Sequence, residues 1–165
     1  MITQKPFFTF LFLSLILGSM MSCSSPRKAV STAMHSDINP LRFEIVEQAK
    51  STVGSGYKYG ATGKQKFDCS GLIYSLFQSH SISLPRSTTE MARYGEPIKL
   101  QEVQPGDLIF FRNVRKIDHV AIVSRKTQSG TWLIHSTTSR GVVEEILEKS
   151  PYWRSRIDQC RRFIP

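Results

Sequence analysis

One cysteine, at the start of a predicted helix, is the strongest candidate for a nucleophile in this chain. Asp68, directly before Cys69, is a good N-cap because its carboxylate can accept hydrogen bonds from the free backbone N–H groups of the first turn. Apolar residues then recur at helical spacing, which predicts a helix over residues 69–78 with a buried face of Leu72, Ile73, Leu76 and Phe77. A thiol in the first turn lies at the positive end of the helix dipole, which favours the nucleophilic thiolate.

Cys69 needs a base, because a cysteine at the root of an apolar helix is otherwise better explained as a small buried hydrophobic residue. A β-hairpin further along the chain could supply one. Residues 118–124 and 131–136 are rich in β-branched and apolar side chains, and the polar loop between them ends at Gly130. A loop centred near Thr127 would set the pairing of these two strands.

In that pairing His119 lies opposite His135 on one face of the sheet. Directly opposed residues have Cβ atoms about 4.5 to 5.5 Å apart, so one imidazole could orient the other through a hydrogen bond. The small side chain of Ala121 beside them would leave room for a helix to pack on this face and bring Cys69 to His119. The arrangement is that of a cysteine hydrolase, in which a third polar group fixes the tautomer of the base.

A metal site is the alternative for the same part of the chain. Its donors would be Cys69, His119, His135 and Cys160. These residues lack the short spacings that are typical of structural zinc sites, and such a site would leave Asp68 without a role. We therefore favour catalysis and expect no metal and no other cofactor.

The beginning of the chain has the order of an export signal. Lys5 is followed by an apolar run over residues 7–17 and by small residues before Cys23. The run is shorter than the ~18 to 20 apolar residues that a membrane-spanning helix needs. A cysteine after a small residue resembles the bacterial lipoprotein box, although Met20 and Met21 depart from its usual residues. We expect residues 1–22 to be a lipoprotein signal peptide and Cys23 to be lipidated.

The remaining organisation follows from composition. Residues 23–40 are rich in serine and show no periodicity, which indicates a tether. For a lipoprotein we expect export and anchoring in the cell envelope, at the periplasmic face of the outer membrane. Residues 41–165 suffice for one folded domain with its own core. A helix should begin there, with Asn39 as N-cap, Pro40 at its first position and a buried stripe of Leu41, Ile45, Ala49 and Val53.

Charge and cysteine content narrow the partners. The formal net charge is +9, and it becomes +8 once the single lysine before Cys23 is removed. For an exported protein this favours acidic wall polymer or anionic lipid over nucleic acid, although a merely solvated basic surface would have the same composition. The chain has three cysteines without regular spacing, so no disulfide framework is implied and Cys160 should be a buried bystander.

Short signals between these features complete the domain. A glycine-rich stretch over residues 54–60 delivers Tyr57 close to the Cys69 helix, and it lacks the Lys-Ser/Thr ending of a phosphate-binding loop. Ser87 and Glu90 form a capping box that opens a short helix. Residues 105–107 predict a turn before a short apolar strand over residues 108–111.

Six motifs occur in a fixed order: Gly56-Tyr57-Lys58-Tyr59-Gly60, Phe67-Asp68-Cys69-Ser70-Gly71-Leu72, Leu84-Pro85-Arg86-Ser87, Pro105-Gly106-Asp107-Leu108-Ile109-Phe110-Phe111, Asp118-His119-Val120-Ala121-Ile122 and Leu133-Ile134-His135-Ser136. Together they resemble the NlpC-type papain-like cysteine peptidases, which cut bacterial cell-wall peptides. The resemblance covers about residues 41–165. It implies a papain-like α+β domain with helices packed on a small antiparallel sheet or half-barrel.

The resemblance also implies roles for individual residues. Cys69 would be the nucleophile, His119 the base and His135 the residue that orients it, with Tyr57 and Ser70 near the oxyanion or substrate. The implied reaction is hydrolysis of peptidoglycan stem peptides at the bond from D-glutamate to a diamino acid, commonly meso-diaminopimelate, by a monomer. A cysteine amidase or acyltransferase on the same fold and a catalytically silent wall-binding lipoprotein stay open as alternatives.

Overall fold

Two helices begin where the sequence predicts them. The computed structural model of the protein describes residues 39–63 and 65–165, and the predicted signal peptide, Cys23 and the tether up to residue 38 lie outside these residues. Helix α1 (Pro40–Ser51) is capped by Asn39, whose side chain accepts a hydrogen bond from the backbone N–H of Leu41. Helix α2 (Cys69–Ser79) is capped by Asp68. In the described part of the chain, no helix has both the length and the apolar character that crossing a bilayer requires.

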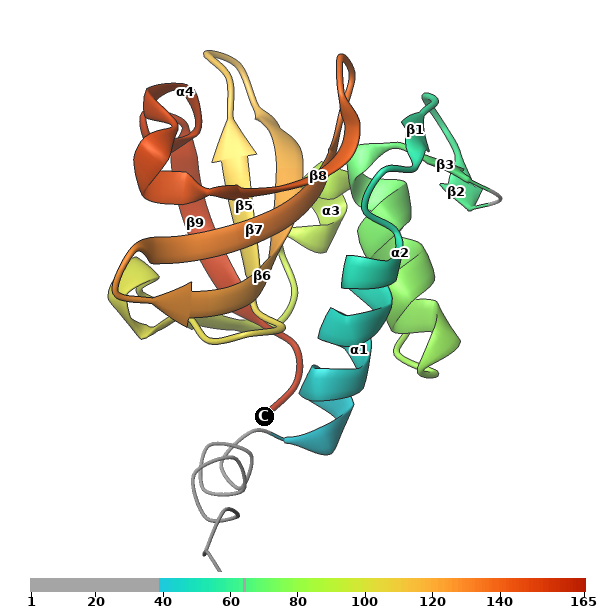
Figure 1. Ribbon diagram of the computed structural model, residues 1–165, viewed down its shortest axis with the longest axis horizontal. Helices are drawn as coiled ribbons and strands as arrows, with labels where there is room; N and C mark the ends of the chain where they lie inside the picture. The colour runs from blue at the N-terminus through green and yellow to red at the C-terminus, as the bar shows by residue number, and fades with distance from the viewer. Residues whose placement is uncertain (1–38, 64) are drawn as a thin grey trace, which may run out of the picture. The chain divides into compact units, whose positions relative to one another are not determined.

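The helices accompany a six-stranded antiparallel sheet (Figure 1). Its strand order is β4-β9-β5-β6-β7-β8, so the C-terminal strand lies inside the sheet rather than at its edge. The strands are β4 (Glu96–Ile98), β5 (Leu108–Arg112), β6 (Ile117–Thr127), β7 (Gly130–Thr137), β8 (Gly141–Ile146) and β9 (Ile157–Arg162). Helices on an antiparallel sheet make this an α+β domain, as expected.

Smaller elements complete the domain. A three-stranded sheet of order β1-β3-β2 lies just before α2 in the chain. The short elements are β1 (Gly56–Tyr57), β2 (Thr62–Gly63), β3 (Lys66–Phe67), α3 (Thr88–Met91), α4 (Pro151–Arg154) and two 3-10 turns, η1 (Leu100–Glu102) and η2 (Leu147–Lys149). Ser87 caps α3 as predicted, because its hydroxyl accepts from the Glu90 backbone N–H, but the Glu90 carboxylate accepts from that same hydroxyl instead of completing the capping box at the Ser87 backbone N–H.

The large sheet has a core on each face. Helices α1 and α2 lie side by side on one side of it, while α4 lies on the other (Figure 1). The buried face of α2 matches the prediction, with Leu72, Ile73, Leu76 and Phe77 all at most 1% exposed. These residues pack with Val120 and Ile122 of β6. Of the stripe predicted for α1, Ile45 and Ala49 are buried and Leu41 is partly buried against the same core, whereas Val53 lies beyond the end of the helix and is 45% exposed.

Ala121 lies on the other face of β6, where it packs with Trp153 of α4. The prediction that its small side chain makes room for the Cys69 helix is therefore wrong. Successive residues of a strand face opposite sides, so the helix covers Val120 and Ile122 while Ala121 shares its face with His119. Cys69 instead contacts β6 at the beginning of the strand, near Asp118.

The hairpin register also differs from the prediction. Strands β6 and β7 are joined by a two-residue turn, with Thr127 opposite Gly130, and Ser124 is the extra residue of a β-bulge. Beyond the bulge Ile122 lies opposite Ile134, and the same register carried on would oppose His135 to Ala121. The two histidines are thus diagonal neighbours on one face instead of directly opposed. The predicted register was wrong by two residues, which preserves the face because the side-chain period of a strand is two.

A buried ion network ties both ends of the domain to the turn before β5. Asp107 is fully buried, and its carboxylate accepts from Arg42 of α1 and from Arg162 of β9 at 2.8 Å. Arg42 also donates to the backbone carbonyls of Pro105 and Ile164. Three segments that are far apart in the sequence therefore meet around one carboxylate.

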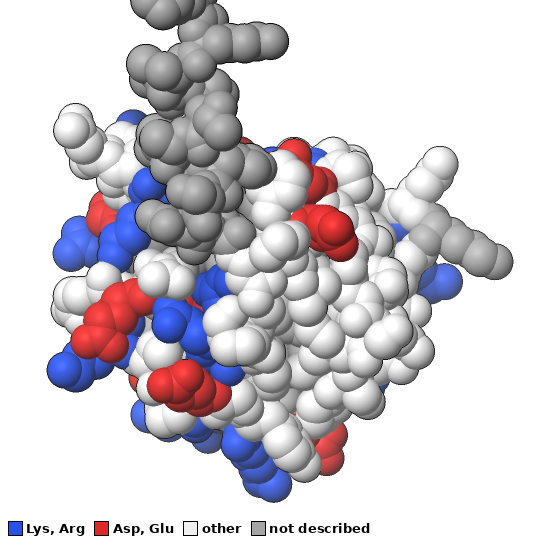
Figure 2. All heavy atoms as spheres, turned by 90° about the horizontal axis from the view of Figure 1, so that it is seen from below, with Lys and Arg blue, Asp and Glu red and all other residues white. Residues whose placement is uncertain are grey.

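Much of the positive charge is neutralised locally. Among the described residues, the arginines in ion pairs are Arg42, Arg86, Arg112, Arg125, Arg140, Arg156 and Arg162. On the face seen in Figure 2, Lys and Arg side chains lie among Asp and Glu side chains rather than in an unbroken basic patch. The high net charge alone therefore does not define a binding surface on this face.

Candidate active site

Asp68 holds the helix that presents Cys69. Its Oδ1 accepts from the backbone N–H of Gly71 at 2.6 Å and its Oδ2 from that of Gly60 at 2.7 Å. Arg86 adds a salt bridge of 2.7 Å to Oδ2. Burial alone would raise the pKa of Asp68, but the hydrogen bonds from Arg86, Gly71 and Gly60 outweigh it and lower the pKa below its usual value. The cap therefore stays ionised and fixes the start of α2.

Ser70, predicted to lie near the oxyanion or substrate, is a buried part of this cap. Its hydroxyl accepts from Arg86 at 2.8 Å and donates to Asp68 at 3.3 Å. The side chain is thereby committed to the cap. Only its backbone N–H is directed at the reacting group, since it forms a hydrogen bond with the sulfur of Cys69.

The Cys69 sulfur lies beside the beginning of β6, in the part of that strand that precedes its pairing with β7. Its Sγ is 3.7 Å from the Thr88 hydroxyl and 3.8 Å from the carbonyl oxygen of Asp118, and the backbone N–H of Val120 also contacts it. Burial raises the pKa of the thiol, and the hydrogen bond from Thr88 only partly opposes this. The helix N-terminus was expected to favour the thiolate, but desolvation outweighs its effect, so the free protein holds Cys69 as a thiol.

A chain of side chains runs inward from His119. Its Nε2 lies 2.9 Å from Nδ1 of His135, and Nε2 of His135 lies 2.7 Å from Oε1 of Glu145. His135 is fully buried and His119 is 9% exposed. Burial, followed by the nearby His135 and Arg156, lowers the pKa of His119 well below 6.5. The imidazole is therefore neutral at physiological pH and can accept a proton.

The C-terminal part of the domain closes around this chain. The Trp153 ring stacks on His119 with centroids 4.4 Å apart and an angle of 20°, and its indole N–H donates to Glu145 at 3.0 Å. A single nitrogen of Arg156, Nη2, donates to both carboxylate oxygens of Asp118, the residue before His119, at 2.8 and 2.9 Å. Sequence reasoning missed these contacts. The loop that ends at Gly141 predicts a second hairpin, formed by β7 and β8. In that hairpin Val143 pairs with His135, so Glu145, two residues further along β8, lies on the same face.

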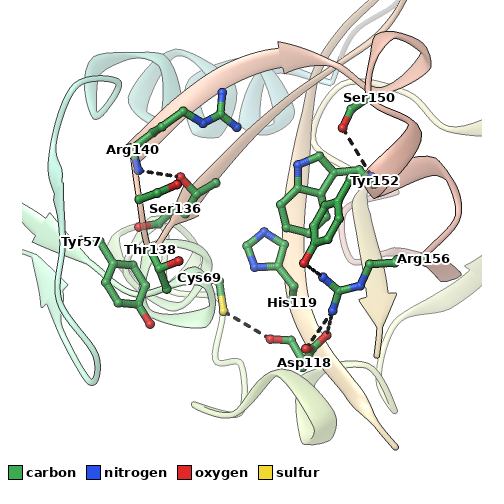
Figure 3. Close-up of a pocket in the computed structure, with 13 residues that line it drawn as sticks. Tyr57, Cys69, Asp118, His119, Ser136, Thr138, Arg140, Ser150, Tyr152 and Arg156 are labelled. Atoms are coloured by element: carbon green, nitrogen blue, oxygen red, sulfur yellow. Dashed lines mark hydrogen bonds and ion pairs between the residues drawn. The ribbon is translucent and has the colours of Figure 1, made fainter. Parts of the chain in front are cut away.

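Cys69 lies between two cavities. One, of about 480 Å³, is lined by Cys69, His119, Arg140 and Tyr152, and the other, of about 560 Å³, by Cys69 together with residues near the start of α3. Tyr57 lines both, and Figure 3 shows its ring on the opposite side of Cys69 from His119. Burial, then the nearby Cys69 and Asp68, raises the pKa of Tyr57, so its phenol keeps the proton and can donate it in a hydrogen bond.

The other cysteine lies apart from this chain of contacts. Cys160 is free, 3% exposed and part of the core that contains Ala121, and burial raises its pKa to about 11. The prediction that Cys160 is buried is confirmed. Within residues 39–63 and 65–165, no three His, Cys, Asp or Glu side chains are grouped so that they could hold a metal ion.

Comparisons with known proteins find relatives of this chain. The chain is 36% identical over 119 residues to the gamma-DL-glutamyl hydrolase of Bacillus subtilis, which is 72% of this chain and 29% of that protein. It is 30% identical over 125 residues to the Escherichia coli murein DD-endopeptidase MepS/murein LD-carboxypeptidase, which is 75% of this chain and 64% of that protein. The chain thus spans less than two thirds of both relatives.

The fold has solved counterparts. A crystal structure of an NlpC/P60 family protein from Bacillus cereus superimposes with a TM-score of 0.68 at 29% identity, over 75% of this chain and 40% of that one. The domain therefore has the papain-like α+β fold. The NlpC/P60 family pattern matches residues 54–162, which include the cysteine, both histidines and Glu145. By this match, the chain belongs to the NlpC/P60 family.

Proposed function

We propose that the protein is a peptidoglycan peptidase that uses Cys69 as nucleophile, His119 as base and His135 as the residue that orients the base. The observation that carries the proposal is the direct hydrogen bond between the two histidines beside a cleft that contains Cys69. The hydrogen bond to His135 fixes the His119 ring, and burial lowers the pKa of His119, so the imidazole is neutral before it acts as a base. The names of the murein-cleaving relatives support the substrate.

In the first half of the reaction, the Cys69 thiol gives its proton to Nδ1 of His119, whose other nitrogen is engaged by His135. The sulfur forms a bond to the carbonyl carbon, and the carbonyl oxygen takes the negative charge. The backbone N–H of Cys69 and the phenol of Tyr57 are the donors we assign to that oxygen. The C–N bond then breaks as His119 passes the proton to the leaving amine, and a thioester remains on Cys69.

In the second half, water attacks the thioester. His119 takes a proton from the water, the C–S bond breaks, and the proton returns to the Cys69 sulfur. The products are a peptide with a free carboxylate and the restored thiol. No metal or redox step is needed for this sequence.

We propose that the bond cleaved joins D-glutamate to a diamino acid of a stem peptide. A relative named for gamma-glutamyl hydrolysis supports it, and so do cavities on both sides of Cys69, which suit a substrate that extends in both directions. The test is mass spectrometry of purified murein fragments incubated with the full-length protein in detergent. New termini at D-glutamate support the proposal. Cleavage only between two D-residues would contradict the proposed bond but keep the peptidase activity. Intact fragments would contradict the peptidase activity itself.

Removing the second histidine should misorient the base without removing it. We expect His135→Ala to lower kcat by about 10²- to 10⁴-fold, with His119→Ala worse than any His135 variant. His135→Asn and His135→Gln should each recover part of the loss by restoring an acceptor for His119. Asn should do better, since its Oδ1 is bonded to Cγ as Nδ1 of the imidazole is. Murein turnover is measured beside the melting temperature.

The outcome can separate orientation from packing. His135 is fully buried, so a mere packing role is the competing explanation. In that case every variant would melt earlier, Asn would be no better than Ala, and specific activity of the folded fraction would stay at the wild-type value.

We propose further that Cys23 is lipidated and anchors the exported domain to a membrane of the cell envelope. Cys23→Ser should then release soluble protein, since the serine-rich segment after it carries no apolar stretch that could hold a membrane. Fractionation with and without detergent measures this. Hydrolysis in vitro should be unaffected, and a mutant that still needs detergent for release would refute the anchor.

A further inference from the structure

We propose that Glu145 is a positioning residue for the reaction: it fixes the tautomer of His135 and the place of Trp153, and through both it aims His119 at Cys69. The inference rests on the proposed function for its effect on rate. Its effect on the histidine tautomer is independent of any activity.

Glu145 is the end point of three hydrogen bonds. A single oxygen, Oε1, accepts from His135 at 2.7 Å, from Arg140 at 2.8 Å and from the indole N–H of Trp153 at 3.0 Å. The side chain is 21% exposed and belongs to neither cavity beside Cys69. It therefore contacts the residues that hold the base and does not line the space for the substrate.

The tautomers follow from the charge of this carboxylate. The hydrogen bonds from His135 and Arg140 outweigh burial and lower the pKa of Glu145 to about 2, so it is ionised at any pH at which the enzyme works. An ionised carboxylate can only accept, so Nε2 of His135 must carry a proton. Whenever the His135 ring carries only this one proton, its lone pair is on Nδ1 and can accept from Nε2–H of His119. The lone pair of His119 is thereby left on Nδ1, the nitrogen that the proposed mechanism uses.

Trp153 is a second residue through which Glu145 restrains His119. Its ring lies flat on His119, and its only polar atom is bonded to Glu145. Because α4 is a single turn, this bond fixes the rotation of the indole, and the indole limits the tilt of the imidazole. One carboxylate thus restrains His119 both through His135 and through the stacked ring.

The charge itself also contributes. Glu145 raises the pKa of His119, in opposition to burial, His135 and Arg156, which lower it. The negative charge therefore favours the imidazolium that forms as Cys69 attacks. A variant without the charge should have a slower chemical step. It should also hold His119 neutral down to lower pH.

The experiment compares Glu145→Ala and Glu145→Gln with Glu144→Ala as the matched control. Glu144 is the adjacent carboxylate of β8, it is equally exposed at 20%, and it also pairs with an arginine, Arg125, but it bonds to Ser124 instead of His135. Full-length proteins in detergent are assayed for kcat and KM on wall peptides over a range of pH. Side-chain ¹⁵N spectra report the histidine tautomers, and the chain has only four histidines to assign.

We expect Glu145→Ala to lower kcat by about 10- to 100-fold with little change in KM, by analogy with other residues that orient a ligand or base from behind. Glu145→Gln should recover part of the rate, because its amide oxygen still accepts. The sign of the pH effect follows from His119: activity is lost as pH falls through its pKa, so both variants should shift the acid limb to lower pH. The spectra should show His135 losing its single Nε2–H form in Glu145→Ala.

Other results would overturn the proposal. One is a Glu145→Ala protein with wild-type His135 tautomer and wild-type pH profile, and another is a Glu144→Ala protein that reproduces the same changes. If Glu145→Ala does not fold, Glu145→Gln decides, and an unmoved acid limb rejects the role. If the wild-type protein cleaves no wall peptide, the proposed function fails, and the tautomer spectra alone still decide whether Glu145 positions His135.

Discussion

Replacing Cys69 by alanine is expected to abolish murein hydrolysis, with a loss of on the order of 10⁴-fold or more, as for other catalytic nucleophiles. The fold should survive, because the sulfur lies at a helix start beside the cleft and its removal opens no large core cavity. The Asp68 cap does not use the thiol and should continue to hold α2. Activity on murein fragments is compared with the circular dichroism spectrum and melting temperature of the variant.

Cys160 provides the control for that experiment. Cys160→Ala removes the second described thiol from a buried site, so it should cost stability but leave the specific activity of the folded protein unchanged. Retained hydrolysis by Cys69→Ala would reject the peptidase mechanism. A metal site would behave differently, since a strong chelator would inactivate or unfold the wild-type protein while thiol alkylation would matter less.

The largest loss of stability is expected from Asp107→Ala. The change leaves the buried guanidinium of Arg42 without its counter-charge, and it also removes the partner of Arg162 and an acceptor for the backbone N–H of Gln104. Breaking one side of a buried ion pair typically costs about 3 to 5 kcal/mol in the free energy of unfolding. Denaturant unfolding followed by circular dichroism measures it. Asp107 lines neither cavity beside Cys69, so the folded fraction should still hydrolyse murein.

A surface ion pair of similar length provides the comparison. Glu47 and Lys50 of α1 are 2.7 Å apart, but their side chains are 46% and 37% exposed, against 0% for Asp107 and 4% for Arg42. Glu47→Ala should therefore change the free energy of unfolding by about 1 kcal/mol or less. Equal losses in the two variants would contradict the structural importance of the buried network.

Local signals were sufficient for the elements that carry the reactive groups. The cap at Asp68 and the apolar spacing after it predicted α2 within one residue of its observed end. The two β-branched runs predicted the β6–β7 hairpin. His119 and His135 lie on one face, as predicted, but only because the bulge at Ser124 compensates for the two-residue turn. These features depend on residues close in sequence, so sequence patterns report them.

Features that depend on distant contacts escaped prediction. The raised pKa of Cys69 comes from burial by segments that meet only in the fold, which no cap or dipole argument contains. The packing of α2 on the Val120 face instead of the Ala121 face is a choice between two sides of one strand. Glu145 and Trp153 follow His135 in the chain, but the hydrogen bond of Glu145 to His135 and the stacking of Trp153 on His119 exist only because β8 and α4 return to this part of the domain.

The spacing of the two histidines obeys an odd-even rule because of the bulge at Ser124. They are 16 residues apart, and an uninterrupted hairpin closed by a two-residue turn would put residues at an even separation on opposite faces. With this turn, one unpaired residue is obligatory. A relative that keeps the spacing but has a three-residue turn would need none, and neither would one that keeps the turn but has its histidines an odd number of positions apart. The histidine spacing, taken together with the length of the turn, therefore tells which members of the family need a bulge in this hairpin to bring their histidines to one face.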